Sequence, residues 1–454
     1  MDESTTDVRF SSHASLAALG ALLREKELLG PVAEHVRIRQ KSIKYTPVEK
    51  LQDAFISLLA GAHGLVEINT LLRSDPALQR AFGRSSCAEQ SVVQQTLSAA
   101  TADNVIQMQA AYRQIYRAHS LGYRHDYQTS FQVLDADMTG NPCGKKAEFA
   151  SKGYFANERN RRGRQLGRVL ATRYQEIVTE QLLDGKKQLP QTLIGLISDA
   201  EQGLELDRAK RERTIVRVDS GGGSLDDVNW LLSQGYQFHG KEYSAIKARR
   251  LADSVEQWFP DPRVPGREVG WVTEPAHEYV SPVRRIAVRC RKDNGQWGIG
   301  VLISTVTTQE VFAQTRLPFT YAPMEQLLAY VYFYDARGGG IETSFKGDKQ
   351  GLGMTQRNKH SFTGQQMLQW LTALAHNVII WAKQWLLPEA PALKRYGIRR
   401  IVRDILRISG HIEQNEQQIV SISLNQRAPM ANQIAKALER LLRTAHVAIT
   451  LGET

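Results

Sequence analysis

Strand-length apolar runs alternate with helix-length segments through the middle of the chain. Residues 131–137 and 214–218 are rich in β-branched and aromatic side chains and end beside glycine or small polar residues, as strands do. Between them, residues 189–206 carry apolar side chains at helical spacing. Ser224 is a good N-cap for a further helix over residues 225–235. This order of strands and helices is typical of an α/β fold.

Changes in periodicity divide the chain into five segments. Residues 1–128 read as helices, and the α/β pattern occupies residues 129–246 and 331–387. Residues 247–330 lose the helical period and are predicted to form a β-rich insertion, and residues 388–454 a mixed C-terminal domain. The helical first segment fits either a helical bundle or a helix-turn-helix reader of DNA.

Local signals place several elements within these segments. Thr46 and Glu49 form a capping box at the start of one helix, and Asp103 is expected to cap another. The turn Asn294–Gly295 lies between alternating runs and predicts a β-hairpin. Residues 327–334, LLAYVYFY, precede three glycines and are expected to form a buried strand.

Composition limits the class of protein. The chain has 58 Lys and Arg against 47 Asp and Glu, a net charge of +11, and this basic excess favours a polyanionic partner, most often nucleic acid. No apolar run reaches the roughly 18 residues that span a bilayer, so no membrane association is expected. The cysteines Cys87, Cys143 and Cys290 are far apart, and the N-terminus is polar, so a reducing, cytoplasmic location is expected.

Three carboxylates stand beside glycine or small polar residues at the ends of predicted elements. Asp137 closes the first strand, Asp219 closes the strand that precedes three glycines, and Glu342 opens a helix after three more. Such acids hold two divalent ions roughly 3.5–4 Å apart, which clamp the oxygens of a phosphodiester. The hard oxygen ligands favour Mg²⁺ or Mn²⁺. Asp135 lies on the same face of its strand as Asp137 and is the alternative ligand.

Other phosphate-binding and catalytic motifs fail on detail. A dinucleotide-binding G-x-G-x-x-G motif that began at Gly221 would need glycine at position 226, where Asp226 stands. Asp219 would also face the pyrophosphate with its negative charge. The segment TGNPCGKK has the wrong spacing for a P-loop, and there is no HExxH or G-x-S-x-G motif. The sequence therefore favours a site of carboxylates and metal ions.

The third carboxylate stands in a recognisable spacing. Tyr334 and Arg337 are three positions apart, and Glu342 and Lys349 are seven apart, which is close to two helical turns and puts both on one face. This pattern resembles the Tyr-Arg-Glu-Lys signature of one group of DDE transposases of bacterial insertion sequences. Here the interval between Arg337 and Glu342 is one residue longer than in the signature, apparently by one extra glycine.

The two aspartates resemble the other motifs of these transposases. Asp137 is followed two positions on by Thr139, within an apolar strand. Asp219 lies in the run Arg-x-Asp-Ser-Gly-Gly, which is followed by a helix and then by Gly235–Tyr236. The resemblance covers residues 130 to 385 and includes a β-rich insertion before the third motif.

The resemblance implies an RNase H-like core and a transposase that binds terminal inverted repeats. Asp137, Asp219 and Glu342 would be catalytic metal ligands, with Asp135 as the alternative to Asp137, and two Mg²⁺ or Mn²⁺ ions would activate water for strand cleavage. The freed 3′-hydroxyl would then join target DNA, and in the resembled group a hairpin can form at the transposon end.

The resemblance also implies partners and contacts. Transposon-end and target DNA would be bound by a homodimer in a paired-end complex, associated with the nucleoid. Tyr334, Arg337 and Lys349 would contact DNA, and Trp297 would stack on a flipped base, with core packing as its alternative role. Two other functions remain open: an RNase H-like nuclease that does not join strands, and a domesticated, non-catalytic DNA-binding protein.

Overall fold

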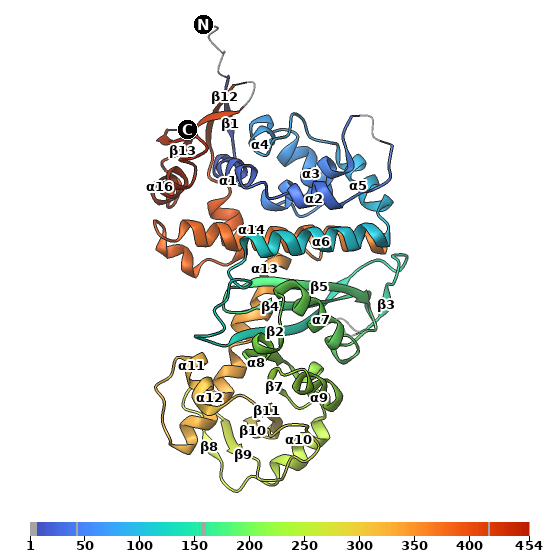
Figure 1. Cartoon of the computed structure of the whole chain (residues 1–454), viewed down its shortest axis with the longest axis vertical. Coiled ribbons are helices and arrows are strands. Elements are labelled where there is room, and N and C mark those ends of the chain that lie inside the picture. Colours follow the sequence, from blue (N-terminus) through green and yellow to red (C-terminus); the bar gives the residue numbers. More distant parts are fainter. Residues whose placement is uncertain (1–6, 42–43, 154, 156–159, 416–417, 454) are drawn as a thin grey trace.

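The computed structural model describes residues 7–41, 44–153, 155, 160–415 and 418–453. The first six residues of the expected N-terminal segment therefore lie outside the described residues. Figure 1 shows an elongated molecule, with the N-terminal helices and the C-terminal sheet at one end and the strands of residues 247–330 at the other. No described helix is long and apolar enough to cross a membrane.

Five strands form the centre of a mixed sheet. Their spatial order is β5 (Glu176–Asp184), β4 (Arg162–Ala171), β2 (Gln132–Pro142), β6 (Thr214–Val218) and β7 (Gln237–Lys241). The pairs β5–β4 and β4–β2 are antiparallel, while β2–β6 and β6–β7 are parallel. Because β2, β6 and β7 run parallel, their carboxyl ends point toward the same edge of the sheet, and this arrangement agrees with the predicted α/β fold.

Strands from residues 247–330 extend this same sheet. They continue beyond β7 in the order β11 (Trp297–Ser304), β10 (Arg284–Arg291), β9 (Arg267–Trp271) and β8 (Phe259–Pro260). The predicted hairpin is confirmed, because β10 and β11 are antiparallel and Gly295 has a φ of +76° in the turn. The short β3 (Ser151–Lys152) lies at the other edge, against β4.

Helices cover both faces of the sheet. On one face lie α7 (Leu193–Leu204) and α9 (Leu225–Ser233), and Ser224 caps α9 as predicted. On the other lie α12 (Pro323–Asp335), α13 (Thr343–Gly351) and α14 (Phe362–Leu386). The remaining helices of this region are α8 (Arg208–Glu212), α10 (Ala245–Ala252) and α11 (Thr308–Thr315).

The buried strand expected at residues 327–334 is wrong, because this segment belongs to the helix α12. Pro323 stands in the first turn of the helix, where its missing N–H costs nothing. The helix is packed between the sheet and α11, so almost every side chain from Leu327 to Phe333 is buried. A helix buried on most sides has no polar stripe, and its sequence cannot be told from that of a buried strand by periodicity.

The N-terminal segment is helical after its first strand. Its helices are α1 (Ala14–Glu25), α2 (Gly30–His35), α3 (Pro47–Leu59), α4 (Pro76–Ala81), α5 (Gln90–Ala99) and α6 (Ala102–His119). The capping box of Thr46 and Glu49 is confirmed. The cap expected at Asp103 is wrong: Thr101 caps α6, because its hydroxyl accepts from the Asn104 amide at 3.3 Å. The helix α6 packs beside α14 across the middle of the molecule (Figure 1).

The two ends of the chain share a second sheet. Its order is β1 (Asp7–Ser11), β12 (Gly410–Gln414), β13 (Ile419–Asn425) and β14 (Ala448–Gly452). The expectation of helices alone before residue 128 is thus wrong for β1. That strand is short and mostly exposed, and it exists because β12 supplies its hydrogen-bond partners. The hairpin β12–β13 and the amphipathic α16 (Ala431–Leu441) agree with prediction, although residues 416–417 of the hairpin lie outside the described residues.

Candidate active site

The three glycines after α12 form a kinked helical joint. One turn of π-helix, η5 (Gly338–Glu342), connects α12 to α13, and Gly340 breaks the helical geometry with φ −95° and ψ −106°. A Cβ atom at Gly340 would lie 2.7 Å from Asp135 Oδ2 and 2.8 Å from Thr172 Cγ2. A Cβ at Gly339 would meet nothing within 4 Å. Of these two positions, close packing therefore requires glycine only at 340.

The π-turn explains the unusual interval between Arg337 and Glu342. A single π-turn accommodates one residue more than an α-helical turn, and such turns recur at functional sites. The extra residue noted in the sequence lies inside η5. The helical path from α12 to α13 thus absorbs the additional glycine, and Glu342 still ends the joint immediately before α13.

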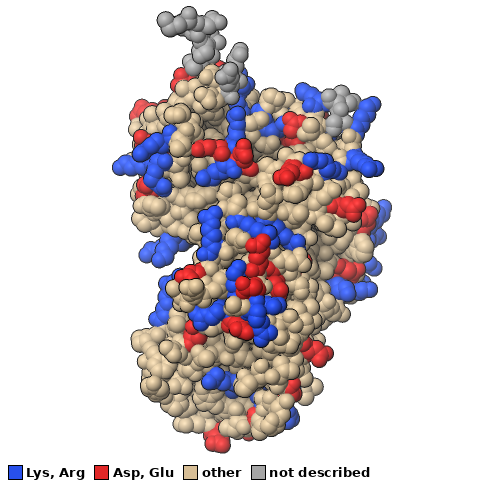
Figure 2. Space-filling model, in the orientation of Figure 1, with Lys and Arg blue, Asp and Glu red and all other residues tan. Residues whose placement is uncertain are grey.

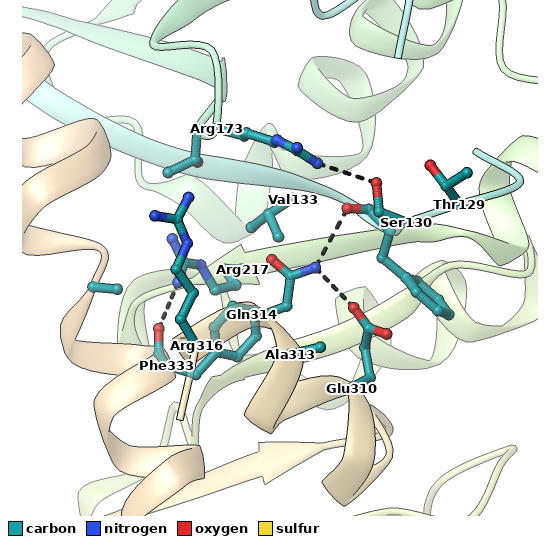
Figure 3. A pocket seen from close by; sticks show the side chains of 13 residues that line it. Thr129, Ser130, Val133, Arg173, Arg217, Glu310, Ala313, Gln314, Arg316 and Phe333 are labelled. Carbon is teal, nitrogen blue, oxygen red and sulfur yellow. Dashed lines mark hydrogen bonds between the residues drawn. The ribbon is translucent and has the colours of Figure 1, made fainter. Parts of the chain in front are cut away.

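Asp135 anchors the joint to the sheet. It is fully buried and accepts two hydrogen bonds from Arg217, at 2.7 Å from Nε and 2.9 Å from Nη2. Arg217 also donates to the carbonyl of Phe333 at the end of α12 (Figure 3). Because both carboxylate oxygens bind one guanidinium, this bidentate pair commits Asp135 to holding β2, β6 and α12 together.

Asp137 lies in the middle of β2, so the prediction that it closes the strand is wrong. The strand continues to Pro142 because β4 pairs with it as far as Gly163. Arg337 Nη2 lies 3.1 Å from Asp137 Oδ2, and the Met138 amide donates to Oδ1 at 2.7 Å. Burial, together with the charges of Asp219 and Glu342, raises the pKa of Asp137 to about 7, although Arg337 opposes the shift.

The other two predicted carboxylates lie on the joints that follow β6 and α12. Asp219 is partly buried, and its Oδ1 accepts from the Gly221 amide at 2.7 Å, which fixes the turn after β6. Glu342 is exposed at the end of η5. The charge of each raises the pKa of Asp137, so both lie near that carboxylate.

The donors fit a divalent metal ion by their chemistry, because carboxylate oxygens are the ligands that Mg²⁺ and Mn²⁺ prefer. Within the described residues, no three His, Cys, Asp or Glu side chains are close enough together to hold a metal ion. Arg337, only 3% exposed, supplies the nearest positive charge to Asp137 instead. The ligand set is therefore present without being gathered into a coordination shell.

Two predicted DNA contacts, Tyr334 and Arg337, face the carboxylates. The Arg337 guanidinium lies 5.7 Å from the centre of the Tyr334 ring, and burial raises the pKa of that phenol. Arg337 Nε is buried without a hydrogen-bond partner among the described residues. Arg337 thus pairs with Asp137 through Nη2, while its Nε–H donor has no acceptor among the described residues.

Lys349 reaches the same face of β2 from α13. Its Nζ donates to Thr139 Oγ1 at 2.6 Å, two residues along the strand from Asp137. Burial lowers the pKa of Lys349, the charge of Arg168 lowers it further, and Asp137 opposes them. Lys349 is therefore held beside the candidate site and is not a freely solvated charge.

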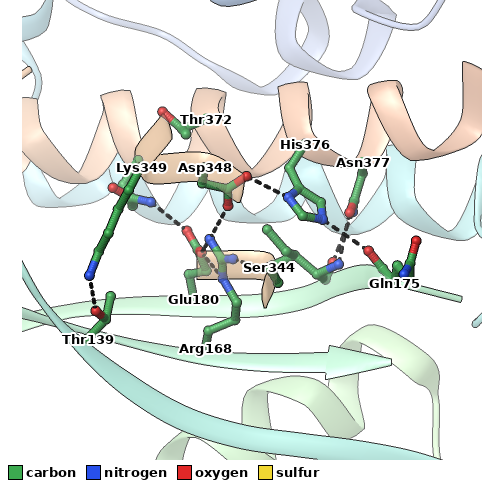
Figure 4. A network of polar contacts seen from close by, with 12 residues as sticks. Thr139, Arg168, Gln175, Glu180, Ser344, Asp348, Lys349, Thr372, His376 and Asn377 are labelled. Carbon is green, nitrogen blue, oxygen red and sulfur yellow. Dashed lines mark hydrogen bonds and ion pairs between the residues drawn. The ribbon is translucent and has the colours of Figure 1, made fainter. Parts of the chain in front are cut away.

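A buried ionic network that the sequence did not reveal fixes α13. Arg168 Nη2 lies 2.6 Å from Asp348 Oδ2, and Arg168 Nε donates to Glu180. His376 Nδ1 lies 2.7 Å from Asp348 Oδ1 (Figure 4). Although burial disfavours its charged form, the neighbouring His376 and Arg168 hold the pKa of Asp348 below its usual value. The polar pair His376 and Asn377 inside an apolar helix was the only sequence signal for this network.

Trp297 lies apart from these groups. It is the first residue of β11, and β6 and β7 separate that strand from β2 in the sheet. The Arg289 guanidinium stacks on both Trp297, at 4.6 Å, and Trp258, at 4.1 Å, and pairs with Glu268. Trp297 is 36% exposed, so part of its ring remains open to solvent.

Comparison with known proteins finds a matching family model and a similar solved structure. The family model of the transposase DDE domain, group 1, matches residues 205–446, a range that contains Asp219 and Glu342. No curated protein sequence matches. A solved structure, the synaptic complex of piggyBac transposase with hairpin DNA, has 10% sequence identity and a TM-score of 0.43, and the match covers 95% of this chain and 82% of that one.

Proposed function

The chain belongs to the transposase DDE domain family, group 1, and on that premise we propose that it cuts and joins DNA at the terminal inverted repeats of an insertion sequence. The observation that carries the proposal is the position of Asp137 on the central strand β2, 3.1 Å from Arg337 Nη2 and near enough to Asp219 and Glu342 for their charges to raise its pKa. A purely structural role does not require two further carboxylates on separate elements that disfavour the ionised form of Asp137.

The strand arrangement supports an RNase H-like core for this activity. In the order β5–β4–β2–β6–β7, the first three strands are antiparallel and the last two are parallel to β2. Asp137 stands on the central strand and Asp219 follows its parallel neighbour. We assign the metal-ligand role to Asp137 and not to Asp135, because Arg217 occupies both oxygens of Asp135.

Asp137, Asp219 and Glu342 would hold one or two Mg²⁺ or Mn²⁺ ions. When bound, such ions act as Lewis acids on the attacking and leaving oxygens of a phosphodiester. Arg337 favours the ionised form of Asp137 that a cation requires. Lys349, held near Asp137 by Thr139, offers a positive charge to a phosphate at this site. Strand joining by the freed 3′-hydroxyl, in a homodimer that pairs two DNA ends, completes the proposal.

Trp297 would stack on an unpaired base at a second place on the DNA. Its ring is partly open on the outer part of the sheet, beside the cations of β10. A ring that already packs on Arg289 is rigid, which favours stacking on an unpaired base.

The test uses a plasmid that carries the gene with its flanking DNA. With Mg²⁺ or Mn²⁺, the wild-type protein should release the element and join it to a second plasmid, whereas Asp219→Asn should bind the same DNA and cut none. Asp226→Asn, an exposed acid on α9, is the matched control and should cut normally. Cleavage without joining would instead support a nuclease, and binding without cleavage by the wild-type protein would support a non-catalytic DNA-binding protein.

A further inference from the structure

A groove of about 320 Å³ lies beside the helix that follows Glu342. One wall is formed by η5 and α13, and includes Gly340, Thr343 and Lys346. The other wall comes from α14 and from α15 (Ile398–Arg400), at the start of the C-terminal segment. We call this the α13 groove.

The α13 groove is lined by cations without carboxylates. Lys346, Arg399 and Arg400 line it, and none of its lining residues is Asp or Glu. The side chains of Lys346 and Arg399 are exposed and make no hydrogen bond or ion pair with any residue that the structure describes. Arg400 stacks on Tyr396 at 3.6 Å and pairs weakly with Asp404 at 3.4 Å. The groove thus holds two uncompensated positive charges.

The cavity in Figure 3 shows that a cationic lining alone does not make an anion site. That cavity, of about 370 Å³, contains Glu310 among its arginines. Its Arg217 is already paired with Asp135, and its Arg173 donates to Ser130 at 3.1 Å. Its positive charge is therefore partly compensated from within, unlike that of the α13 groove.

Close packing fixes the backbone that carries Arg399 in the α13 groove. A Cβ atom at Gly351 would lie 2.9 Å from the backbone N and Cα of Arg399, and one at Gly347 would lie 3.4 Å from Cβ of Ile398. These two glycines are one turn apart on α13, so α15 lies directly against the helix. Arg399 is therefore carried by packed structure and not by a loose loop.

The α13 groove borders the candidate active site. Gly340 lines it, and the same residue packs against Asp135 on its other side. Thr343, also in the lining, immediately follows Glu342. A polyanion in the groove would thus lie next to the joint that carries the third carboxylate.

We propose that the α13 groove binds the sugar–phosphate backbone of duplex DNA beside the phosphodiester that is cut, an inference that rests on the proposed function. An ammonium and a guanidinium that pair with no carboxylate are typical of phosphate contacts, which position DNA without reading its sequence. Glycine at positions 339 and 397, where a Cβ atom would meet nothing within 4 Å, leaves the groove open for a backbone to approach.

The test is the salt dependence of DNA binding by Lys346→Ala/Arg399→Ala. Binding to a mixed-sequence 30-base-pair duplex is followed by fluorescence anisotropy in EDTA over a range of KCl concentrations. Loss of two phosphate contacts should make the slope of log K against log [KCl] shallower by about 1.8 and weaken binding about 60-fold at 0.1 M KCl. Arg399→Lys keeps the charge and should retain the wild-type slope.

The matched control is Arg249→Ala/Lys436→Ala, which removes one Arg and one Lys that are exposed on α10 and α16, outside the groove. Its slope should equal that of the wild type. An unchanged slope in the groove variant, or equal losses in both double variants, would overturn the proposal. Binding in EDTA is measured without cleavage, so this test is independent of the proposed function. If the wild-type protein binds with the expected slope but does not cut DNA when Mg²⁺ or Mn²⁺ is present, the transposase function is refuted and the DNA-binding role of the groove is retained.

Discussion

Replacement of Asp348 by Asn should loosen the helix that follows Glu342. Asn has nearly the same shape as Asp, so the change removes a charge without a cavity. Asp348 is fully buried and bridges Arg168 on β4 to His376 on α14. After the change, Arg168 keeps Glu180 and Ser344 as partners, while His376 loses its carboxylate.

The magnitude follows from these remaining contacts. Removal of one partner of a buried ion pair costs about 3–5 kcal/mol, because the other charge stays buried. Since Glu180 still neutralises Arg168, the lower end of about 3 kcal/mol applies. If α13 opens as a local unit, that free energy corresponds to amide exchange about 150-fold faster than in the wild type.

Hydrogen exchange measured by mass spectrometry on peptides that cover α13 tests this expectation. Asp404→Asn is the control, because Asp404 also pairs with arginines but is 21% exposed, and surface pairs contribute about 1 kcal/mol or less. The reasoning would be refuted by exchange in α13 of Asp348→Asn within threefold of the wild type. Exchange as slow as in the control would likewise show that the network does not hold the helix.

Three further outcomes follow from single residues. Asp137 has a pKa of about 7 and must lose its proton to bind a cation, so Mn²⁺ should raise the melting temperature more at pH 8 than at pH 6. Equal shifts of the melting temperature at the two pH values would contradict the ligand role of Asp137. Burial lowers the pKa of His239 to about 3, so between pH 6.5 and pH 3 the unfolded chain takes up a proton on this residue and the folded protein does not. Between neutral pH and pH 5 the wild type should therefore lose about 2 kcal/mol of unfolding free energy, and His239→Phe should not. Parallel pH profiles of the two proteins in urea unfolding would contradict this role of His239. Gly340→Ala should destabilise by about 1–3 kcal/mol through the contact with Asp135, while Gly339→Ala should be nearly neutral in the same assay, and similar costs at both positions would exclude the close contact as the cause.

Features set by neighbouring residues were predictable from the sequence. The capping box at Thr46 and the hairpin at Asn294–Gly295 depend on a few adjacent side chains and backbone torsions, and both are present. The α/β alternation was predictable for the same reason, because the turn residues and the periodicity of each element are local. The family assignment agrees with the resemblance drawn from the motifs around Asp219 and Glu342.

Features set by distant partners were not predictable. Asp137 lies in mid-strand because β4 continues the ladder beyond it, and β1 is a strand because β12 pairs with it across most of the chain. The network of Arg168, Asp348 and His376 joins β4 to the successive helices α13 and α14, with Asp348 180 positions after Arg168. No periodicity reports such contacts, because the pairing of these side chains depends on how the elements pack in space.

The same limit applies to the basic excess of the chain. Arg168 and Arg217 are buried against carboxylates, and Arg337 is turned toward Asp137. On the face in Figure 2, Lys and Arg are interspersed with Asp and Glu and do not form one continuous patch. Net charge therefore overstates the cations available to DNA. The useful quantity is the number of cations near the candidate site that pair with no carboxylate. By that measure we expect Lys346 and Arg399 to contribute more to DNA binding than the signature residue Arg337, whose charge is already engaged by Asp137.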